Sequence, residues 1–534
     1  MFDTRLTTDT VGGQMFTWTY DKLDRVLTET YPDGSVVAWT YDVLGRRSTM
    51  TDPDGRVTVY TYGSSPSNKG LAQISDDFGK SANYIYGTDG RLAEEVYRQN
   101  NNDLSVNYWN YDSAGRVGSL GHYSFAEMAI IRLEQYTYNA ASMRTRIDYS
   151  SDGFVQPYHK LYSYDALGQL TQEHKRWTGN NASAYRYAYT YDPAGNRTQL
   201  VHYNGSSTQT VASTYNDGNQ LVTQSGEPIS YDSNGNVHEI SDLIGYNHNA
   251  DNRLTAAYDA WGQNATYYYD ALGRRIGRKS GDGVTWTRYY YDGLNILMTR
   301  ENSPATGAAW RTRRAYTLKQ ASIGQIIAEH TATAWTSTGT PSVWNHQFYH
   351  FDLLGNTTAN TDATGMVSNI IDMEAFGTVL QGGQDGFRLT TKEYDPEARA
   401  YYFNARWYAV SIGKFLESAP TFPFTEHNYA LSDNTPTLRI DPTGQQPSPP
   451  FPEESARSLG NDCAESGVAG QRFGGIQGGC GTGDPSISKC LRRKCCAECC
   501  STHSEGHRYS AAVCTASCLG LLNSVPRNPS SVPF

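Results

Sequence analysis

The sequence predicts an all-β protein built on one long antiparallel sheet, followed by a small helical segment. Three observations predict this class. The 534 residues include 40 tyrosines and 50 glycines, and only 18% are charged, which excludes a disordered chain and a coiled coil. Short runs with period-two alternation recur through the first part of the chain, and each ends in a turn sequence. All nine cysteines lie after residue 462, which marks a separate final segment.

Charge and hydropathy exclude further classes of protein. The formal net charge is −10, whereas a dedicated nucleic-acid-binding protein usually has a basic face, so we expect no nucleic acid on the repeats. No run of about 18 apolar residues occurs, so no membrane span is predicted. Residues 1–16 do not resemble a signal peptide. Because the repeats have begun by Tyr20, we expect the chain to be the C-terminal piece of a longer protein.

One motif, Tyr-Asp-x-x-Gly-Arg/Asn, dominates the first part of the chain. Its copies and close variants are Tyr20–Arg25, Tyr41–Arg46, Tyr111–Arg116, Tyr164–Gln169, Tyr191–Asn196, Tyr231–Asn236 and Tyr269–Arg274. The distance is 21 residues from Tyr20 to Tyr41 and 27 from Tyr164 to Tyr191. A period that drifts in this way favours a β-array with variable loops.

Each repeat predicts one β-hairpin. Residues alternate before the motif, as in Thr58–Tyr62 and Tyr185–Tyr191, and this alternation is typical of half-buried strands. The motif aspartate can bond the backbone two residues on, and glycine accepts the positive φ of a turn. Second turns such as Pro32–Gly34 separate the motifs. Because isolated hairpins are unstable, we expect one shared sheet, with successive motif tyrosines stacked on neighbouring strands.

The tyrosines and aspartates of the motif are therefore interpreted as scaffold. The nonapeptide calcium pattern Gly-Gly-x-Gly-x-Asp does not occur in the repeats. We accordingly expect neither a metal nor another cofactor in this part of the chain.

The motif resembles the YD repeats of bacterial Rhs proteins, Tc-toxin B and C components and teneurins. A second resemblance, to the Rhs repeat-associated core, is carried by Tyr349–Asn356, Thr361–Val367, Glu374–Gly377, Lys392–Glu397, Tyr401–Tyr408, Gly413–Leu416, Asp433–Pro436 and Asp441–Gly444. Together they cover residues 15–444 and divide the chain into a YD-repeat array (1–348) and a core (349–444). The resemblance implies an antiparallel sheet wound into a shell, here possibly incomplete, that encloses a variable C-terminal segment.

The resemblance also implies an aspartyl autoprotease in the core, which would release the C-terminal segment. Such proteolysis needs two carboxylates that share one proton. Asp441 matches one of the two family positions, but Ala419 stands where the family usually has aspartate. Asp433 is a substitute that no motif supports, and Gln445 replaces the usual leucine after Gly444. We therefore predict that self-cleavage is lost or much weakened; the alternative for Asp441 is a plain turn residue.

The tail is predicted to contain a Pro- and Gly-rich linker over residues 445–483 and a helical segment over 484–525. Cys495 and Cys499 are four residues apart, as are Cys514 and Cys518, so each pair shares one helical face. This spacing predicts a helical hairpin with disulfides Cys495–Cys518 and Cys499–Cys514.

Two alternatives remain for the cysteines. A zinc ion could be held by Cys496, Cys499, His503 and His507, because the first two have Cys-x-x-Cys spacing and the histidines lie four residues apart. Free thiols are the other alternative, and the odd number of cysteines leaves at least one unpaired within the chain.

Three hypotheses about function follow. The first is the structural shell of an Rhs-type toxin or secreted surface protein that holds or presents its own C-terminal segment. The second is cell-surface adhesion, because exposed Tyr and Trp side chains can stack on sugar rings. The third places an enzymatic toxin in the tail. The expected partners are the tail itself, an immunity or delivery protein, and glycans, and the expected location is secreted or at the cell surface.

Overall fold

The computed structural model describes residues 4–8 (backbone only), 15–64, 70–307, 309–320, 324–420, 428–445 and 447–448. These residues form a 32-stranded sheet and two smaller sheets, which confirms the predicted all-β class. Two units are distinguished, residues 1–40 with 48–451 and residues 41–47 with 452–534, and the arrangement below is that of the first. None of the helical turns in the described ranges has the length and hydropathy of a membrane-spanning helix.

The strands of the large sheet are β1 (Thr4–Thr8), β2 (Met15–Tyr20), β3 (Val26–Thr30), β4 (Val36–Tyr41), β5 (Arg47–Thr51), β6 (Val57–Tyr62), β7 (Leu71–Asp76), β8 (Lys80–Tyr86), β9 (Leu92–Gln99), β10 (Asn102–Tyr111), β11 (Val117–Ser124), β12 (Ala129–Tyr138), β13 (Arg144–Ser150), β14 (Tyr158–Tyr164), β15 (Leu170–Trp177), β16 (Ser183–Tyr191), β17 (Arg197–Asn204), β18 (Ser207–Tyr215), β19 (Leu221–Gln224), β20 (Glu227–Tyr231), β21 (Val237–Ile240), β22 (Ile244–His248), β23 (Leu254–Asp259), β24 (Gly262–Tyr269), β25 (Arg275–Ser280), β26 (Trp286–Asp292), β27 (Asn295–Asn302), β28 (Arg311–Leu318), β29 (Ile326–Trp335), β30 (Pro341–Phe351), β31 (Thr357–Asp362) and β32 (Val367–Ile370).

The smaller sheets follow. They contain β33 (Asp372–Met373) and β34 (Val379–Gln381) in one, and β35 (Gly386–Phe387), β36 (Glu393–Asp395), β37 (Ala400–Tyr402), β38 (Trp407–Ala409) and β39 (Lys414–Phe415) in the other. The 3₁₀ turns in the described part of the chain are η1 (Ser241–Leu243), η2 (Pro304–Thr306), η3 (Leu389–Thr391) and η4 (Leu431–Asn434).

The motif turns have the predicted local chemistry. In the turn after β14, Leu167 N–H donates to Asp165 Oδ1 (2.9 Å), and Gly168 has a φ of 84°. The pairing of β14 with β15 shifts register between Ser163 and Tyr164. These features are typical of a type I turn followed by a bulge with glycine in the left-handed region. Consecutive strands therefore pair as antiparallel hairpins, as the repeats predicted.

The last residue of the motif has a role that the sequence did not predict. Its side chain folds back on the motif aspartate: Arg116 Nη2 lies 2.7 Å from Asp112 Oδ2, and Arg274 Nε lies 2.7 Å from Asp270 Oδ2. Where asparagine replaces arginine, the amide does the same, as in the 2.9 Å bond from Asn236 Nδ2 to the Asp232 carboxylate. Arg or Asn at this position thus adds a hydrogen bond to the motif aspartate, whereas the Asp165 turn forms without one from the Gln169 side-chain amide nitrogen.

The motif tyrosines do not stack on one another as predicted. Tyr164 ends β14 and Tyr191 ends β16, and β15 lies between these strands. Two inter-strand spacings, about 9–10 Å, separate such residues, so their rings do not form a cross-strand pair. Instead each hydroxyl donates to a carbonyl of an earlier repeat: Tyr164 to Arg144 O (2.6 Å) and Tyr191 to Leu170 O (2.7 Å).

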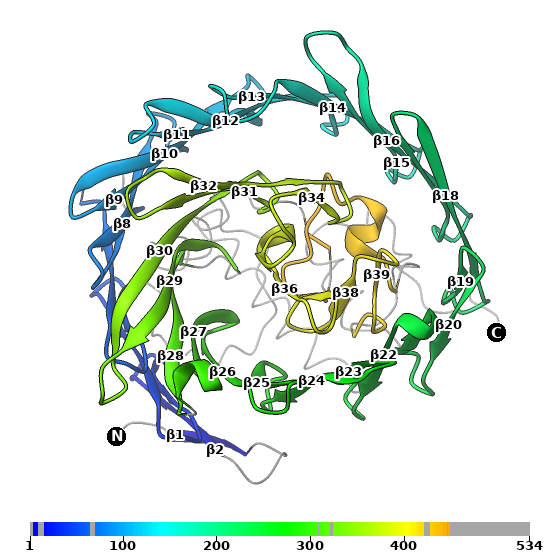
Figure 1. Ribbon diagram of the computed structural model, residues 1–534. Coiled ribbons are helices and arrows are strands. Elements are labelled where there is room, and N and C mark those ends of the chain that lie inside the picture. Colours follow the sequence, from blue (N-terminus) through cyan, green and yellow to red (C-terminus); the bar gives the residue numbers. More distant parts are fainter. Residues whose placement is uncertain are drawn as a thin grey trace, which may run out of the picture. The chain divides into compact units, whose positions relative to one another are not determined.

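The sheet curls so that its last strands lie along the inner side of its first strands (Figure 1). Contacts advance along both segments together. The rings of Tyr31 and Tyr290 are 4.9 Å apart, those of Tyr97 and Phe348 are 5.3 Å apart, and Ser124 Oγ donates to Gly365 O (2.7 Å). Strands β26–β32 therefore form an inner layer against β3–β11.

The short strands after residue 371 lie inside the curled sheet (Figure 1) and pack against strands of it that include β22–β24. One buried cluster joins residues of β22–β24, such as Tyr246 and Tyr267, to Trp407 and Leu416. Tyr246 OH donates to Ala398 O (3.0 Å), and Trp407 Nε1 donates to Tyr269 OH (3.1 Å). These short strands thus form a layer against the wall of repeats, whereas residues 349–351, 357–362 and 367–370 belong to strands of the large sheet.

Candidate functional site

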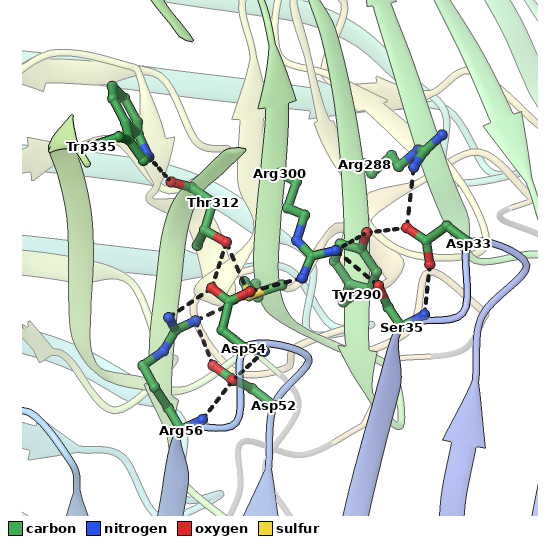
Figure 2. Close-up of polar contacts among 11 residues, drawn as sticks. Asp33, Ser35, Asp52, Asp54, Arg56, Arg288, Tyr290, Arg300, Thr312 and Trp335 are labelled. Atoms are coloured by element: carbon green, nitrogen blue, oxygen red, sulfur yellow. Dashed lines mark hydrogen bonds and ion pairs between the residues drawn. The ribbon is translucent and has the colours of Figure 1, made fainter. Parts of the chain in front are cut away.

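Two polar regions stand out in the described residues. The first is the overlap seam, which we define as Asp33, Asp54, Asp76 and Glu95 with their partners on β26–β30 and in the turn after β28. Figure 2 shows its first part. Asp33 Oδ2 accepts from Tyr290 OH (2.6 Å) and lies 3.1 Å from Arg288 Nη1, and both partners come from β26.

Asp54 makes the densest contacts of the seam (Figure 2). Its carboxylate accepts from Arg300 Nη2 (2.8 Å), Thr312 Oγ1 (2.5 Å) and Arg56 Nη1 (2.8 Å). Burial alone would raise the pKa of Asp54, but Arg56, Thr312 and Arg300 outweigh it and hold that pKa below its usual value. Asp54 is therefore charged at neutral pH, and its side chain links the turn between β5 and β6 to β27 and β28.

The seam continues along the early strands. Asp76 Oδ2 lies 3.2 Å from His330 Nε2, and Glu95 Oε1 lies 3.0 Å from Lys319 Nζ. Asn107 Nδ2 donates to Glu95 Oε2 (3.0 Å). Each of these acidic residues pairs with an arginine, lysine or histidine side chain of the inner layer. The pairs hold the overlapping strands together and do not form a reactive site.

The second region surrounds the peptide group between Gly444 and Gln445, which we call the junction peptide. Arg406 Nε donates to its carbonyl oxygen, Gly444 O, at 2.5 Å. On the other side of the peptide, Gln445 N–H donates to Asp441 Oδ1 (3.0 Å). Arg406 Nη2 and Asp441 Oδ2 are 3.1 Å apart, and both side chains are buried. One ion pair thus holds both ends of this peptide group.

The backbone fits closely around the junction peptide. Gly444 has a φ of 72°, and a Cβ added there would lie 2.8 Å from Phe403 O and 3.2 Å from Arg406 N. Any other residue would clash with backbone atoms and be strained at this φ. Thr443 O accepts from Ala405 N (2.9 Å), and Arg406 Nη1 donates to Asn428 O (2.8 Å).

Two cations lie near Asp441. Burial lowers the pKa of Lys392 to about 7, although the charge of Asp441 opposes that change. Burial also lowers the pKa of Arg406, again against the effect of Asp441. Asp441 is therefore an ion-pair partner and hydrogen-bond acceptor in this geometry.

The other predicted residues of this site are placed as follows. Ala419 N–H donates to Asn428 O (3.0 Å), the same carbonyl that Arg406 binds, so residue 419 lies beside the guanidinium and contributes no carboxylate. Asp433 pairs with the exposed Arg439 (3.1 Å). A buried acid that sequence reasoning missed, Glu417, accepts from Trp407 N–H (2.8 Å) and lies 3.3 Å from His248 Nε2.

The predicted tail features lie outside the described residues. This holds for the disulfide pairs Cys495–Cys518 and Cys499–Cys514 and for the zinc alternative of Cys496, Cys499, His503 and His507. Within the described ranges, no group of three or more His, Cys, Asp or Glu side chains is placed to hold a metal ion.

Comparison with known protein families identifies the repeats. The Teneurin YD-shell family matches residues 111–310, and the RHS Repeat family matches residues 20–57. Residues 20–57 and 111–310 are thus RHS and YD-shell repeats, and we call the wall that the repeats build the YD-shell. Among curated relatives of this YD-shell, the tRNA3(Ser)-specific nuclease WapA of Bacillus spizizenii is 30% identical over 296 residues, and toxin protein Tse5 of Pseudomonas aeruginosa is 27% identical over 342 residues.

The YD-shell spans only part of these relatives. The WapA match covers 53% of this chain but 12% of WapA, and the Tse5 match covers 53% of this chain and 25% of Tse5. Human teneurin-1 is 35% identical over 140 residues, which are 26% of this chain and 5% of teneurin-1. Similar repeats therefore occur in toxin proteins and in an animal protein.

Solved structures share the fold. The Tc holotoxin pore of Photorhabdus luminescens matches with a TM-score of 0.66, and the TcdB2-TccC3 crystal structure matches with a TM-score of 0.64. Each is 16% identical and is matched over 83% of this chain, which covers 25% and 24% of those chains respectively. The YD-shell of this chain thus has the wall architecture of Tc toxin shells.

Part of the junction site was predictable from the sequence. Asp441 belongs to the Asp-Pro-x-Gly motif, whereas Arg406, in the stretch Tyr401–Tyr408, was not predicted to belong to the site. The arginine in the run Asn404-Ala405-Arg406 was a usable signal, because a buried guanidinium beside a buried carboxylate is a common pairing.

Proposed function

We propose that this YD-shell holds its own C-terminal segment, residues 445–534, and keeps it covalently attached through an uncleaved junction peptide. The observation that carries this proposal is the pair of hydrogen bonds by which Arg406 and Asp441 hold the Gly444–Gln445 peptide group, together with the ion pair between them. These contacts hold the first residue of the proposed segment against the core, and Ser448 beyond it still pairs with Ile440. The relationship to toxin shells supports the same role.

The chemistry of the junction peptide explains why we propose that the C-terminal segment is retained rather than released. Arg406 is placed to stabilise negative charge on the carbonyl oxygen of Gly444, as an oxyanion site requires. Hydrolysis also needs a carboxylate to take a proton from water and a carboxylic acid to protonate the leaving nitrogen. Asp441 is the sole carboxylate with a hydrogen bond to this peptide among the described residues, and Ala419 supplies none.

The segment itself is proposed to be the active cargo, with the wall as its container. A toxin in residues 445–534 would require an immunity protein in the producing cell and a delivery protein or secretion route that carries the YD-shell outside. These partners and the secreted or cell-surface location rest on the relationship to toxin proteins alone.

Mass spectrometry and limited proteolysis test this function. Freshly purified protein, denatured before analysis, should give one intact mass of 59.2 kDa. In native buffer, trypsin should cut within residues 445–534 no faster than within residues 70–307. A fragment that begins at Gln445 before any protease is added contradicts retention, and rapid loss of the segment from an intact wall contradicts enclosure.

A further inference from the structure

An open groove lies where the β23–β24 hairpin meets the turn between β36 and β37, and none of its lining residues belongs to the overlap seam or the junction peptide. It has a volume of about 480 Å³ and is lined by the β23–β24 hairpin, Gly281 and residues 396–399. This volume is within the range of small-molecule sites, roughly 300–1,000 Å³. Nothing in the proposed shell function requires such a groove.

Trp261 is the unusual residue of the groove. It stands at the tip of the β23–β24 hairpin with 96% of its surface exposed, and its backbone N–H donates to Asp259 Oδ1 (2.9 Å). A two-residue turn favours Gly, Asn or Asp. An indole at this position loses apolar contact with the core and gains nothing for the turn, so its surface is available to a ligand.

The facing wall of the groove is built under backbone strain. Arg399 has a φ of 53°, in the left-handed region where glycine is usual. A non-glycine residue in that region is strained. The conformation lets Arg399 reach Asp259 Oδ2 (3.4 Å) and Leu243 O (3.3 Å), and so joins three neighbouring segments around the groove.

Charges in the groove cancel in pairs, and this selects the class of ligand. Asp259 pairs with Arg399, and Glu397 Oε2 lies 3.6 Å from Arg278 Nε. Neither an ammonium nor a phosphate or sulfate would meet an uncompensated opposite charge. The groove offers polar groups, including the carboxylates and the amides of Gln263 and Asn264, beside the flat faces of Trp261 and Pro396.

We propose that this groove binds a neutral oligosaccharide, with a pyranose ring stacked on Trp261 and its hydroxyls bound to Asp259, Asn264 and Glu397. A sugar ring has an apolar C–H face and a rim of hydroxyls that both donate and accept hydrogen bonds. That combination matches an exposed indole surrounded by paired charges and amides. The site gives the YD-shell a surface contact with glycans that is independent of its C-terminal segment.

Calorimetric titration of the full chain tests the proposal. The probes are cellotetraose, maltotetraose and chitotetraose, with trilysine and a heparin tetrasaccharide as charged probes. At least one neutral probe should bind at millimolar concentration or below, Trp261→Ala should weaken it about tenfold or more, and Trp261→Phe should retain part of the affinity. The matched control Leu272→Ala, at another exposed hairpin tip, should bind like the wild type.

Circular dichroism of each variant confirms that loss of binding is not loss of fold. The proposal is overturned if no neutral probe binds the wild type, if only a charged probe binds, or if Trp261→Ala binds as tightly as Leu272→Ala.

Discussion

Asp441 and Arg406 form a buried ion pair, with 3.1 Å between Oδ2 and Nη2, and this pair holds both sides of the peptide group that leads into the C-terminal segment. The relationship connects the two parts of the molecule that the sequence separates most clearly, the wall of repeats and the cysteine-rich tail. It also defines which bond would have to break for release.

A carboxylate at position 419 should restore cleavage of the junction peptide. In Ala419→Asp, the new side chain starts from a backbone that shares the Asn428 carbonyl with Arg406, so it would complete a pair with Asp441. We expect a fragment that begins at Gln445 on a denaturing gel, with faster formation at mildly acidic pH, where one of the two carboxyls carries a proton. Ala419→Asn is the isosteric control and should stay uncleaved; a fragment from both variants, or from neither, contradicts the prediction.

Removing Arg406 should destabilise the core strongly. Arg406→Met leaves Asp441 buried without its cation, which costs about 3–5 kcal/mol of unfolding free energy. The matched variant Arg439→Met breaks the exposed pair with Asp433 and should cost less than about 1 kcal/mol. Urea unfolding followed by tryptophan fluorescence measures both, and equal losses would show that the junction ion pair has no special role.

The overlap seam should be loosened by Arg300→Met. This change removes the contacts of β27 with Asp54 and with Ser35 Oγ (2.9 Å), which lie in two different early turns. Hydrogen exchange should become faster at the amides of β3 and β6, with little change at β14–β17. Arg116→Met removes a motif arginine that has no partner in the inner layer among its described contacts, and its effect should stay within its own hairpin. Exchange that is unchanged at β3 and β6 contradicts a seam held by these pairs.

Stability should fall with acid through the buried histidines. Burial and the charge of Lys319 lower the pKa of His350 to about 3, whereas an exposed imidazole titrates near 6.5. Between these values the unfolded chain binds the proton and the folded chain does not, so the unfolding free energy decreases as the pH falls. The largest slope from this residue is about 1.4 kcal/mol per pH unit.

Urea unfolding at pH 7 and pH 5 measures that slope. In the fold, His350 Nδ1 donates to Asn107 Oδ1 (2.7 Å) as the neutral tautomer. His350→Asn should lower the unfolding free energy at pH 7 and flatten its dependence on pH. The same slope in both proteins would show that His350 does not contribute to it.

The hairpins could be predicted because their determinants are local. The alternation before Tyr191 and the turn after Asp165 depend on residues a few positions apart. The seam could not be predicted in this way: Asp54 and Arg300 are separated by 246 residues, and the sequence around each is an ordinary turn and an ordinary strand. Their pairing depends on how far each hairpin twists the sheet, which no short pattern encodes.

The junction site could be predicted in part for the same reason. Asp441 belongs to a recognisable turn sequence, but the residue that completes its function, Arg406, lies 35 positions earlier on the loop before β38. The prediction that motif tyrosines stack on one another was wrong. The sequence shows one motif tyrosine per repeat, but it does not show that each repeat adds two strands to the sheet. Distances across a sheet follow strand count rather than repeat count.

The central claim, that the YD-shell encloses its own C-terminal segment, can be tested with the cysteines. All nine lie between Cys463 and Cys518, so a maleimide reagent reports on the segment alone. Reduced full-length protein should react slowly with a maleimide attached to a large polyethylene glycol and at the full rate in urea, while a small maleimide should react at intermediate speed. Fast native labelling by the large reagent, equal to that in urea, would contradict enclosure.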